Sequence, residues 1–110
     1  MLCMKIQNIF SRLPSASKKE SFKTLKKARG FRIERIVSNG QATAKGAWLV
    51  AKTAEWVIVL QGKAVLVFKA NKKKFILRTG DYVLIPANAF HRVEWTSHKQ
   101  KTVWLAVHLC

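Results

Sequence analysis

Acidic residues are scarce in this sequence of 110 residues. Five Asp and Glu stand against 21 Lys and Arg, which gives a formal net charge of +16 at pH 7. This balance predicts a positive surface potential that attracts polyanions without sequence specificity. One expectation is therefore weak binding to nucleic acid through its phosphates, and the alternative is that a lysine-rich composition serves only solubility.

Cysteine is also nearly absent. The two cysteines, Cys3 and Cys110, stand close to opposite ends of the chain and have no CxxC or Cys/His spacing. This arrangement argues against a zinc ribbon and against a framework of disulfides. We expect reduced thiols, and a disulfide between the two ends of the chain stays open as the alternative.

Long hydrophobic runs are missing as well. The first residues mix apolar side chains with Lys5, Gln7 and Asn8, so they lack the unbroken apolar segment of a signal peptide. No run reaches the length of a membrane span. The sequence therefore predicts a cytoplasmic protein without a membrane partner.

Residues 1–30 are predicted to form a helical extension. Ser17 and Glu20 have the spacing of a capping box, and Gly30 is placed as a C-terminal cap, which predicts a helix over residues 18–29. Apolar residues at helical spacing are Ile6, Ile9, Phe10 and Leu13 before Pro14, then Phe22, Leu25 and Ala28. We expect this helix to pack on the outside of the domain, with its basic side chains either solvated or docked on a polyanion.

From residue 31 onward, short β-rich runs alternate with Gly, Asn and Lys. The runs are FRIERIVS, AWLVA, EWVIVL, AVLVF, KFILR, DYVLI, HRVEWT and TVWLAVHL. Eight short strands without helix-sized segments between them predict an all-β barrel or sandwich rather than a parallel α/β sheet. Because 110 residues bury one modest core, we expect a single domain over residues 31–110 with the extension of residues 1–30 packed on it.

Two spaced motifs stand in the second half of the chain. Six residues separate Glu55 from Gly62, and five residues separate Gly80 from Pro86, with His91 following. These spacings resemble the cupin motifs G(X)5HXH(X)3-4E(X)6G and G(X)5PXG(X)2H(X)3N. The chain thus resembles a small single-domain cupin of uncharacterised function, over most of its length. The resemblance implies a jelly-roll barrel, also called a double-stranded β-helix.

The resemblance also implies a metal site, and the sequence departs from it. Glu55 and His91 match two of the four positions that hold a divalent metal such as Fe, Mn, Ni or Zn in cupins. The two histidines of the first motif would fall at Trp48 and Val50, which cannot ligate a metal, and Trp95 replaces the asparagine of the second motif. Two protein ligands would hold an ion only weakly, so the cofactor is left open.

Strand alternation indicates which side chains would face the barrel interior. Val57 shares a face with Glu55, and Val93 shares a face with His91. We therefore predict a pocket with Glu55 and His91 as its polar, candidate catalytic groups. Its predicted walls are Trp48, Val50, Val93 and Trp95. The Glu55–His91 pair could act as an acid and a base, or it could be a structural hydrogen bond.

His108 shares a strand face with Trp104 and Ala106, so it joins the pocket if the last strand lines it. The alternative for a histidine near a strand end is partial exposure.

Three functions follow from these patterns. The first is a cytoplasmic cupin that binds an unidentified small molecule in its barrel, with a degenerate metal site and with or without catalysis. The second is a basic protein that binds nucleic acid or another polyanion through residues 18–29 and the lysines at 72–74. The third is a divalent-metal-dependent cupin enzyme. A homodimer is expected in each case, because cupins commonly dimerise.

Overall fold

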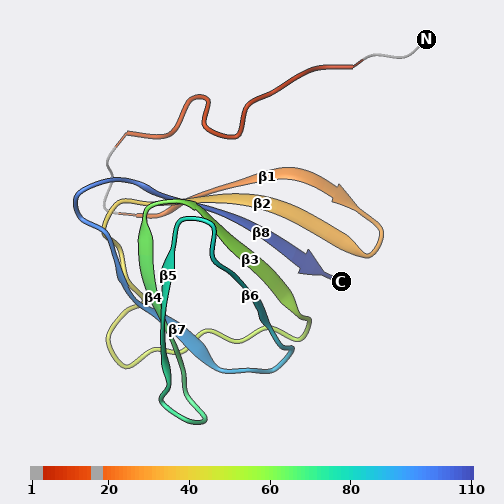
Figure 1. Ribbon diagram of the computed structural model, residues 1–110. Coiled ribbons are helices and arrows are strands. Elements are labelled where there is room, and N and C mark those ends of the chain that lie inside the picture. Colours follow the sequence, from red (N-terminus) through yellow and green to blue (C-terminus); the bar gives the residue numbers. More distant parts are fainter. Residues whose placement is uncertain (1–3, 16–18) are drawn as a thin grey trace.

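The computed structural model describes residues 4–15 and 19–110 and consists of antiparallel strands (Figure 1). The strands are β1 (Ser21–Ala28), β2 (Phe31–Ser38), β3 (Glu55–Gln61), β4 (Lys63–Phe68), β5 (Lys74–Arg78), β6 (Tyr82–Ile85), β7 (His91–Thr96) and β8 (Thr102–Leu109). They form a five-stranded sheet in the order β1-β2-β8-β3-β6 and a three-stranded sheet in the order β5-β4-β7. The predicted all-β class is confirmed. Within the described residues, no helix is long and apolar enough to cross a membrane.

The hydrophobic core lies between the two sheets. Alternation along each strand sends every second apolar side chain inward, so both sheets contribute to one cluster. Its buried members are Val57, Val59, Ala64, Leu66, Leu77, Ile85, Trp104 and Ala106. The inward faces of β3 and β8 supply half of these residues, so this strand pair is central to the core.

The helix predicted over residues 18–29 is wrong, because Ser21–Ala28 is the edge strand β1. It pairs with β2 from Ser21, opposite Val37, to Ala28, opposite Phe31, with a bulge between Thr24 and Lys26. The capping-box residue Ser17 lies outside the described residues. Pairing with a neighbouring strand outweighs the weak helical preference of the segment, as tertiary context commonly does. Gly30, predicted as a helix C-terminal cap, has a positive φ of 92° but closes the β1–β2 hairpin turn instead.

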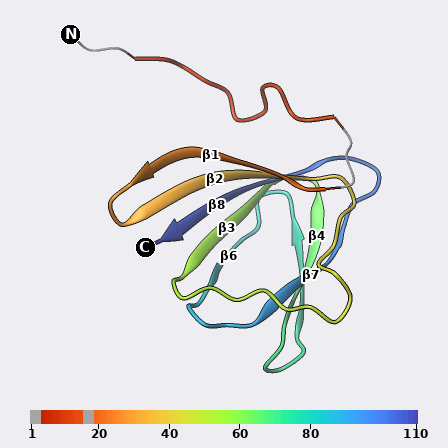
Figure 2. The same ribbon diagram turned by 180° about the vertical axis from the view of Figure 1, so that it is seen from behind.

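Residues 4–15 form no helix either, although their apolar spacing suggested one. Asn8 caps a turn instead: its side-chain oxygen accepts a hydrogen bond from the Phe10 N–H at 2.8 Å. The buried Arg35 of β2 then donates to the carbonyl oxygens of Ile9 and Ser11, at 3.0 and 2.9 Å. Figure 2 shows this segment as an arm on the β1 side of the molecule. The Arg35 guanidinium anchors this arm to β2.

Seven of the eight predicted β runs are strands, and the exception is AWLVA, residues 47–51. This segment makes one isolated bridge, between Leu49 and His91. The Leu49 N–H donates to the His91 carbonyl at 2.6 Å, and the His91 N–H donates to the Leu49 carbonyl at 2.9 Å. The long connection between β2 and β3 is thereby held against β7, close to the interior.

Gly62 joins β3 to β4 where no other residue fits. Its φ is 96°, and a Cβ added there would lie 2.7 Å from the Thr102 Cα atom of β8. The close approach of the β3–β4 corner to β8 therefore requires glycine.

We predict that Gly62→Ala lowers the free energy of unfolding by about 3 kcal/mol, because it combines a left-handed φ with a backbone clash. Urea unfolding followed by tryptophan fluorescence measures this loss. The control is Gly30→Ala, which has a similar φ of 92° but no atom within 4 Å of the added Cβ. It should lose only about 1 kcal/mol. Equal losses of unfolding free energy in the two variants would show that the clash with Thr102 does not contribute to the destabilisation.

Candidate functional site

A cavity of about 530 Å³ lies among the inner faces of the strands and the β2–β3 connection. Twelve of its lining residues are apolar, from Phe22 of β1 to Trp104 of β8. The polar lining residues are Glu20, Glu34, Thr43, Glu55, His91 and His108. Apolar walls with a few convergent polar groups are typical of sites that bind small molecules.

His108 lies between two carboxylates on the cavity wall. Its Nε2 is 3.1 Å from Glu34 Oε1, and its Nδ1 is 3.8 Å from Glu55 Oε2. The strand register explains this geometry, because β8 pairs with β2 on one side and with β3 on the other, and Glu55 stands directly opposite His108. Nε2–H donates to Glu34, while Glu55 is too distant for a hydrogen bond and makes only an ionic contact when the ring is protonated.

Glu20 reaches the cavity from the residue before β1. Its carboxylate accepts a hydrogen bond from the hydroxyl of Ser38, and that hydroxyl oxygen accepts one from the Trp104 indole N–H at 3.1 Å. Ser38 is fully buried, so the three groups form an ordered polar chain beside the cavity. The chain fixes both the carboxylate of Glu20 and the ring plane of Trp104.

His91 begins β7 and occupies another part of the wall. Its side chain is buried, with 6% of the residue exposed, and its Nδ1 is 2.8 Å from the Ala89 carbonyl oxygen. Because a carbonyl only accepts, Nδ1 carries the hydrogen and the neutral ring keeps Nε2 as an acceptor. The two backbone hydrogen bonds with Leu49 hold the start of β7 in place beneath the ring.

The predicted site residues divide into two groups. Glu55 and His91 both line the cavity, although the contact of Glu55 is with His108. Val50 and Val93 line it too, whereas Trp48 and Trp95 do not.

The two tryptophans miss the cavity for different reasons. A bulge in the β4–β7 pairing sets Leu66 opposite Val93 and Val65 opposite Trp95. The bulge adds one residue to β7 and so reverses the alternation of side chains beyond it, which turns Trp95 outward. Trp48 lies in the irregular β2–β3 connection, where its ring is 5.9 Å from Lys69 Nζ.

Sequence analysis missed Glu34 and Glu20 and left His108 open. Glu34 shares its strand face with Arg32, Ile36 and Ser38 in FRIERIVS, which is the more polar face of that run, so alternation did not mark it as an inward side chain. Glu20 had no signal either, because its place at the cavity depends on β1, which the sequence did not predict.

The residues do not fit a metal centre. In the described parts of the chain, no three His, Cys, Asp or Glu residues are grouped so that they could hold a metal ion. Trp48 and Val50 stand at the positions where the cupin motif has its two histidines, and neither side chain can ligate. The groups available for chemistry in this cavity are therefore carboxylates and imidazoles within apolar walls.

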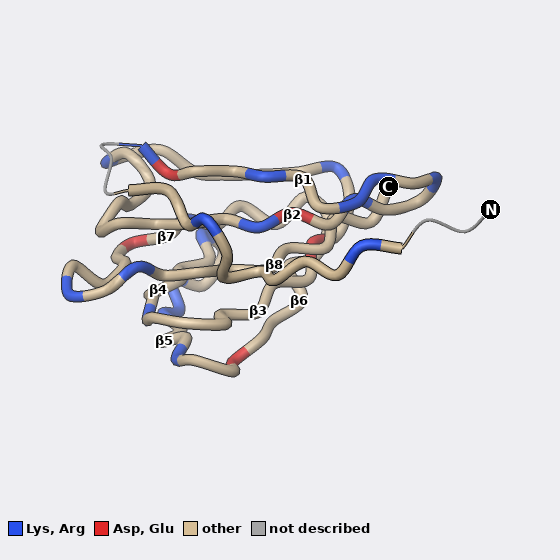
Figure 3. Tube along the Cα trace, turned by 90° about the horizontal axis from the view of Figure 1, so that it is seen from above, with Lys and Arg blue, Asp and Glu red and all other residues tan. Residues whose placement is uncertain are grey.

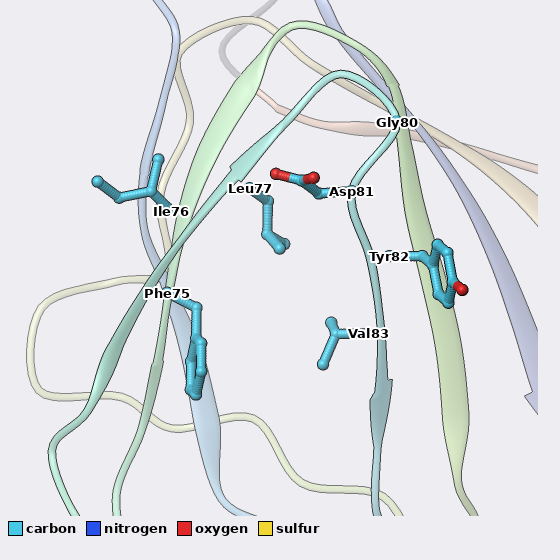
Figure 4. Close-up of a pocket in the computed structure, with 7 residues that line it drawn as sticks. All are labelled: Phe75, Ile76, Leu77, Gly80, Asp81, Tyr82 and Val83. Carbon is cyan, nitrogen blue, oxygen red and sulfur yellow. The ribbon is translucent and has the colours of Figure 1, made fainter.

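A second hollow, of about 400 Å³, lies at the β5–β6 corner (Figure 4). Phe75, Leu77 and Val83 line it with apolar surface, and Asp81 is its one charged residue. Asp81 is occupied by the turn itself, because its Oδ2 accepts a hydrogen bond from the Arg78 N–H at 2.8 Å. The larger cavity, where polar groups converge, is the better candidate site.

Comparisons with known proteins agree with this architecture. A protein from Ralstonia eutropha JMP134 that carries the provisional name mannose-6-phosphate isomerase is similar at 40% sequence identity and a TM-score of 0.91, over 96% of this chain and 98% of that chain. A cupin superfamily protein from Desulfitobacterium hafniense DCB-2 is similar at 17% identity and a TM-score of 0.72, over 88% of this chain and 83% of that chain.

A cupin-2 domain containing protein from Shewanella frigidimarina NCIMB 400 is similar at 16% identity and a TM-score of 0.65, over 82% of this chain and 80% of that chain. None of the curated proteins matches the chain. The model of the cupin domain family matches residues 41–108, which contain β3 to β7 and β8 up to His108. The chain therefore belongs to the cupin domain family.

Proposed function

We propose that this cupin binds a small organic molecule in the cavity between its two sheets. The observation that carries the proposal is the composition of that cavity: twelve apolar residues enclose about 530 Å³, and three carboxylates and two imidazoles converge on it. The apolar walls would bury the body of a ligand, and the polar groups would fix its orientation. The strands and the β2–β3 connection together supply these groups.

The polar groups also have the positions of an acid and a base. His108 donates to Glu34 through Nε2, and His91 donates to the Ala89 carbonyl through Nδ1, so each ring is oriented by a fixed hydrogen bond. Such oriented imidazoles can accept a proton from a bound molecule that lies within hydrogen-bond reach. We assign them first to ligand binding, and proton transfer would follow only for a ligand with a suitably acidic hydrogen.

The name carried by the Ralstonia eutropha relative suggests a sugar phosphate as ligand. Interconversion of an aldose and a ketose moves a proton between carbons and needs a base, which an imidazole here could supply. A phosphate group, however, is usually bound by arginine, lysine or a helix N-terminus. Among the described residues that line the cavity none is a lysine or an arginine, so our proposal is restricted to small-molecule binding.

We predict that filling the cavity abolishes binding of a neutral probe. Ala51 lines the cavity and is itself exposed, so Ala51→Trp should fold while its ring occupies the site. With 2-phenylethanol as probe, saturation-transfer NMR should give an affinity for the wild-type protein that falls about tenfold or more in the variant. The matched control is Ala70→Trp, at an exposed position of the β4–β5 turn outside the cavity. Saturable binding that is the same in all three proteins, or absent from the wild type, would rule the proposal out.

A second candidate function, polyanion binding, rests on the β1–β2 hairpin. β1 is the edge of its sheet, and every residue after Ser21 is exposed. Lys23, Lys26 and Lys27 lie on it without an ion-pair partner among the residues described, and Figure 3 shows basic positions along β1 and at the hairpin tip. Lysines on an edge strand also prevent pairing with another chain, so the charge on β1 has a structural explanation as well. An experiment must distinguish that role from polyanion binding.

We predict that the triple variant Lys23→Gln, Lys26→Gln and Lys27→Gln binds a single-stranded DNA 20-mer more weakly and with a smaller salt dependence. Each lost phosphate contact should lower the slope of log affinity against log salt by about 0.7. Fluorescence anisotropy at several salt concentrations gives both quantities. The control replaces Lys45, Lys52 and Lys99 with glutamine, which removes the same charge from exposed positions outside the β1–β2 and β4–β5 hairpins. Equal effects would mean that net charge alone acts, and would remove the β1–β2 hairpin as a site.

A further inference from the structure

The few acidic residues of this chain are unevenly placed. Of its five, Glu20, Glu34 and Glu55 line the cavity, while Asp81 and Glu94 do not. Chance placement on a lysine-rich surface would scatter them among the basic residues. Instead the cavity holds three carboxylates, and no lysine or arginine is found among its described lining residues.

These carboxylates are incompletely compensated. The side chains of Glu34 and Glu55 are 13% and 18% exposed, and His108 is the only ionic partner that either has among the described residues. The side chain of Glu55 makes no hydrogen bond in the described part of the chain, since its contact with His108 is 3.8 Å long. Buried charges are ordinarily both paired and hydrogen-bonded, because removing them from water is costly. The Glu55 carboxylate on the cavity wall is therefore open to a hydrogen-bond donor from outside the chain.

The Nε2 atom of His91 gives an independent indication that the cavity takes a ligand. Nδ1 is satisfied by the Ala89 carbonyl, whereas Nε2 of this buried ring has no hydrogen-bond partner among the residues described. The ring lines the same cavity. In its neutral form this nitrogen accepts a hydrogen bond, as the carboxylates do. The site thus offers acceptors on more than one wall and lacks a strong cationic donor.

We propose that the ligand of this cavity carries a protonated amine. The proposal rests on the proposed small-molecule function and names the chemical class of the ligand. A bound molecule would displace water from Glu34 and Glu55, and an ammonium group replaces that water with a charge-assisted hydrogen bond. The hydroxyls of a neutral polyol would donate hydrogen bonds to the carboxylates without neutralising their charge, and a phosphate or carboxylate would add repulsion.

The net charge of +16 does not oppose a cationic ligand inside the cavity. At an ionic strength of 0.15 M the Debye length is about 8 Å, so lysines on the outer strands are screened from the interior. Carboxylates on the cavity wall act at contact distance through a region with little water, where charge interactions are stronger. Local placement of charge therefore determines selectivity in the cavity, and net charge acts on the outer surface.

A matched series of probes tests the proposal: 2-phenylethylamine, 2-phenylethanol and phenylacetate share an apolar body and differ in the charge of the head group. Isothermal titration calorimetry of the full chain at 0.15 M salt should rank them amine, alcohol, acid, with the amine at least about tenfold tighter than the acid. Glu55→Gln should remove most of the preference for the amine. Glu94→Gln is the control, because Glu94 pairs with Lys74 on the surface and does not line the cavity.

The outcomes separate the two proposals. Equal affinity for the three probes, or tighter binding of phenylacetate, would overturn the amine proposal and leave small-molecule binding intact. Tighter binding of mannose 6-phosphate than of mannose would also overturn the amine proposal, because the cavity would then prefer an anionic ligand. A preference for the amine that falls equally in Glu55→Gln and Glu94→Gln would overturn the assignment to the cavity. Failure of all three probes to bind the wild-type protein would count against small-molecule binding itself.

Discussion

The pairing of β8 with two neighbours is the constraint on which the site depends. β8 is held by β2 over eight residue pairs and by β3 along most of its length, so its register is fixed from both sides. Because side chains alternate between faces, a slip of one residue would send His108 and Trp104 out of the interior. The fixed register sets His108 opposite Glu55 and diagonal to Glu34, and it also brings Trp104 to Ser38. The polar cluster and the central core are thus consequences of one set of backbone hydrogen bonds.

The opposite wall depends on irregular backbone rather than on regular pairing. The β2–β3 connection reaches the cavity through Leu49 and is tied there to His91 by two backbone hydrogen bonds. A bulge in the β4–β7 pair then turns the end of β7, so that Val93 points inward and Trp95 outward. An extra residue in one strand has this effect wherever it occurs. The regular strands therefore fix one wall, and a bridge and a bulge shape the other.

This division explains how far the sequence could predict the structure. The strands from residue 31 onward follow from alternation and turn residues, and seven of those eight runs are strands. The spacing of the cupin motifs singled out Glu55 and His91, and both residues line the cavity. The wrong assignments have long-range causes, because β1 exists through pairing with β2 and Trp95 faces outward through a bulge, and local sequence records neither. Glu20 was missed with β1, and Glu34 was missed because it shares its strand face with Arg32 and Ser38.

This architecture gives the few acidic residues two different kinds of environment. A carboxylate on the surface of so basic a protein would find a lysine nearby, as Glu94 finds Lys74 at 3.0 Å. Glu34 and Glu55 instead face each other across one imidazole in a cavity whose described lining has no lysine or arginine. The protein therefore separates its charges, with positive charge on an exposed hairpin and negative charge in the interior. The carboxylates would contact an ammonium group directly, whereas the exposed lysines of β1 act through solvent, where salt weakens their repulsion.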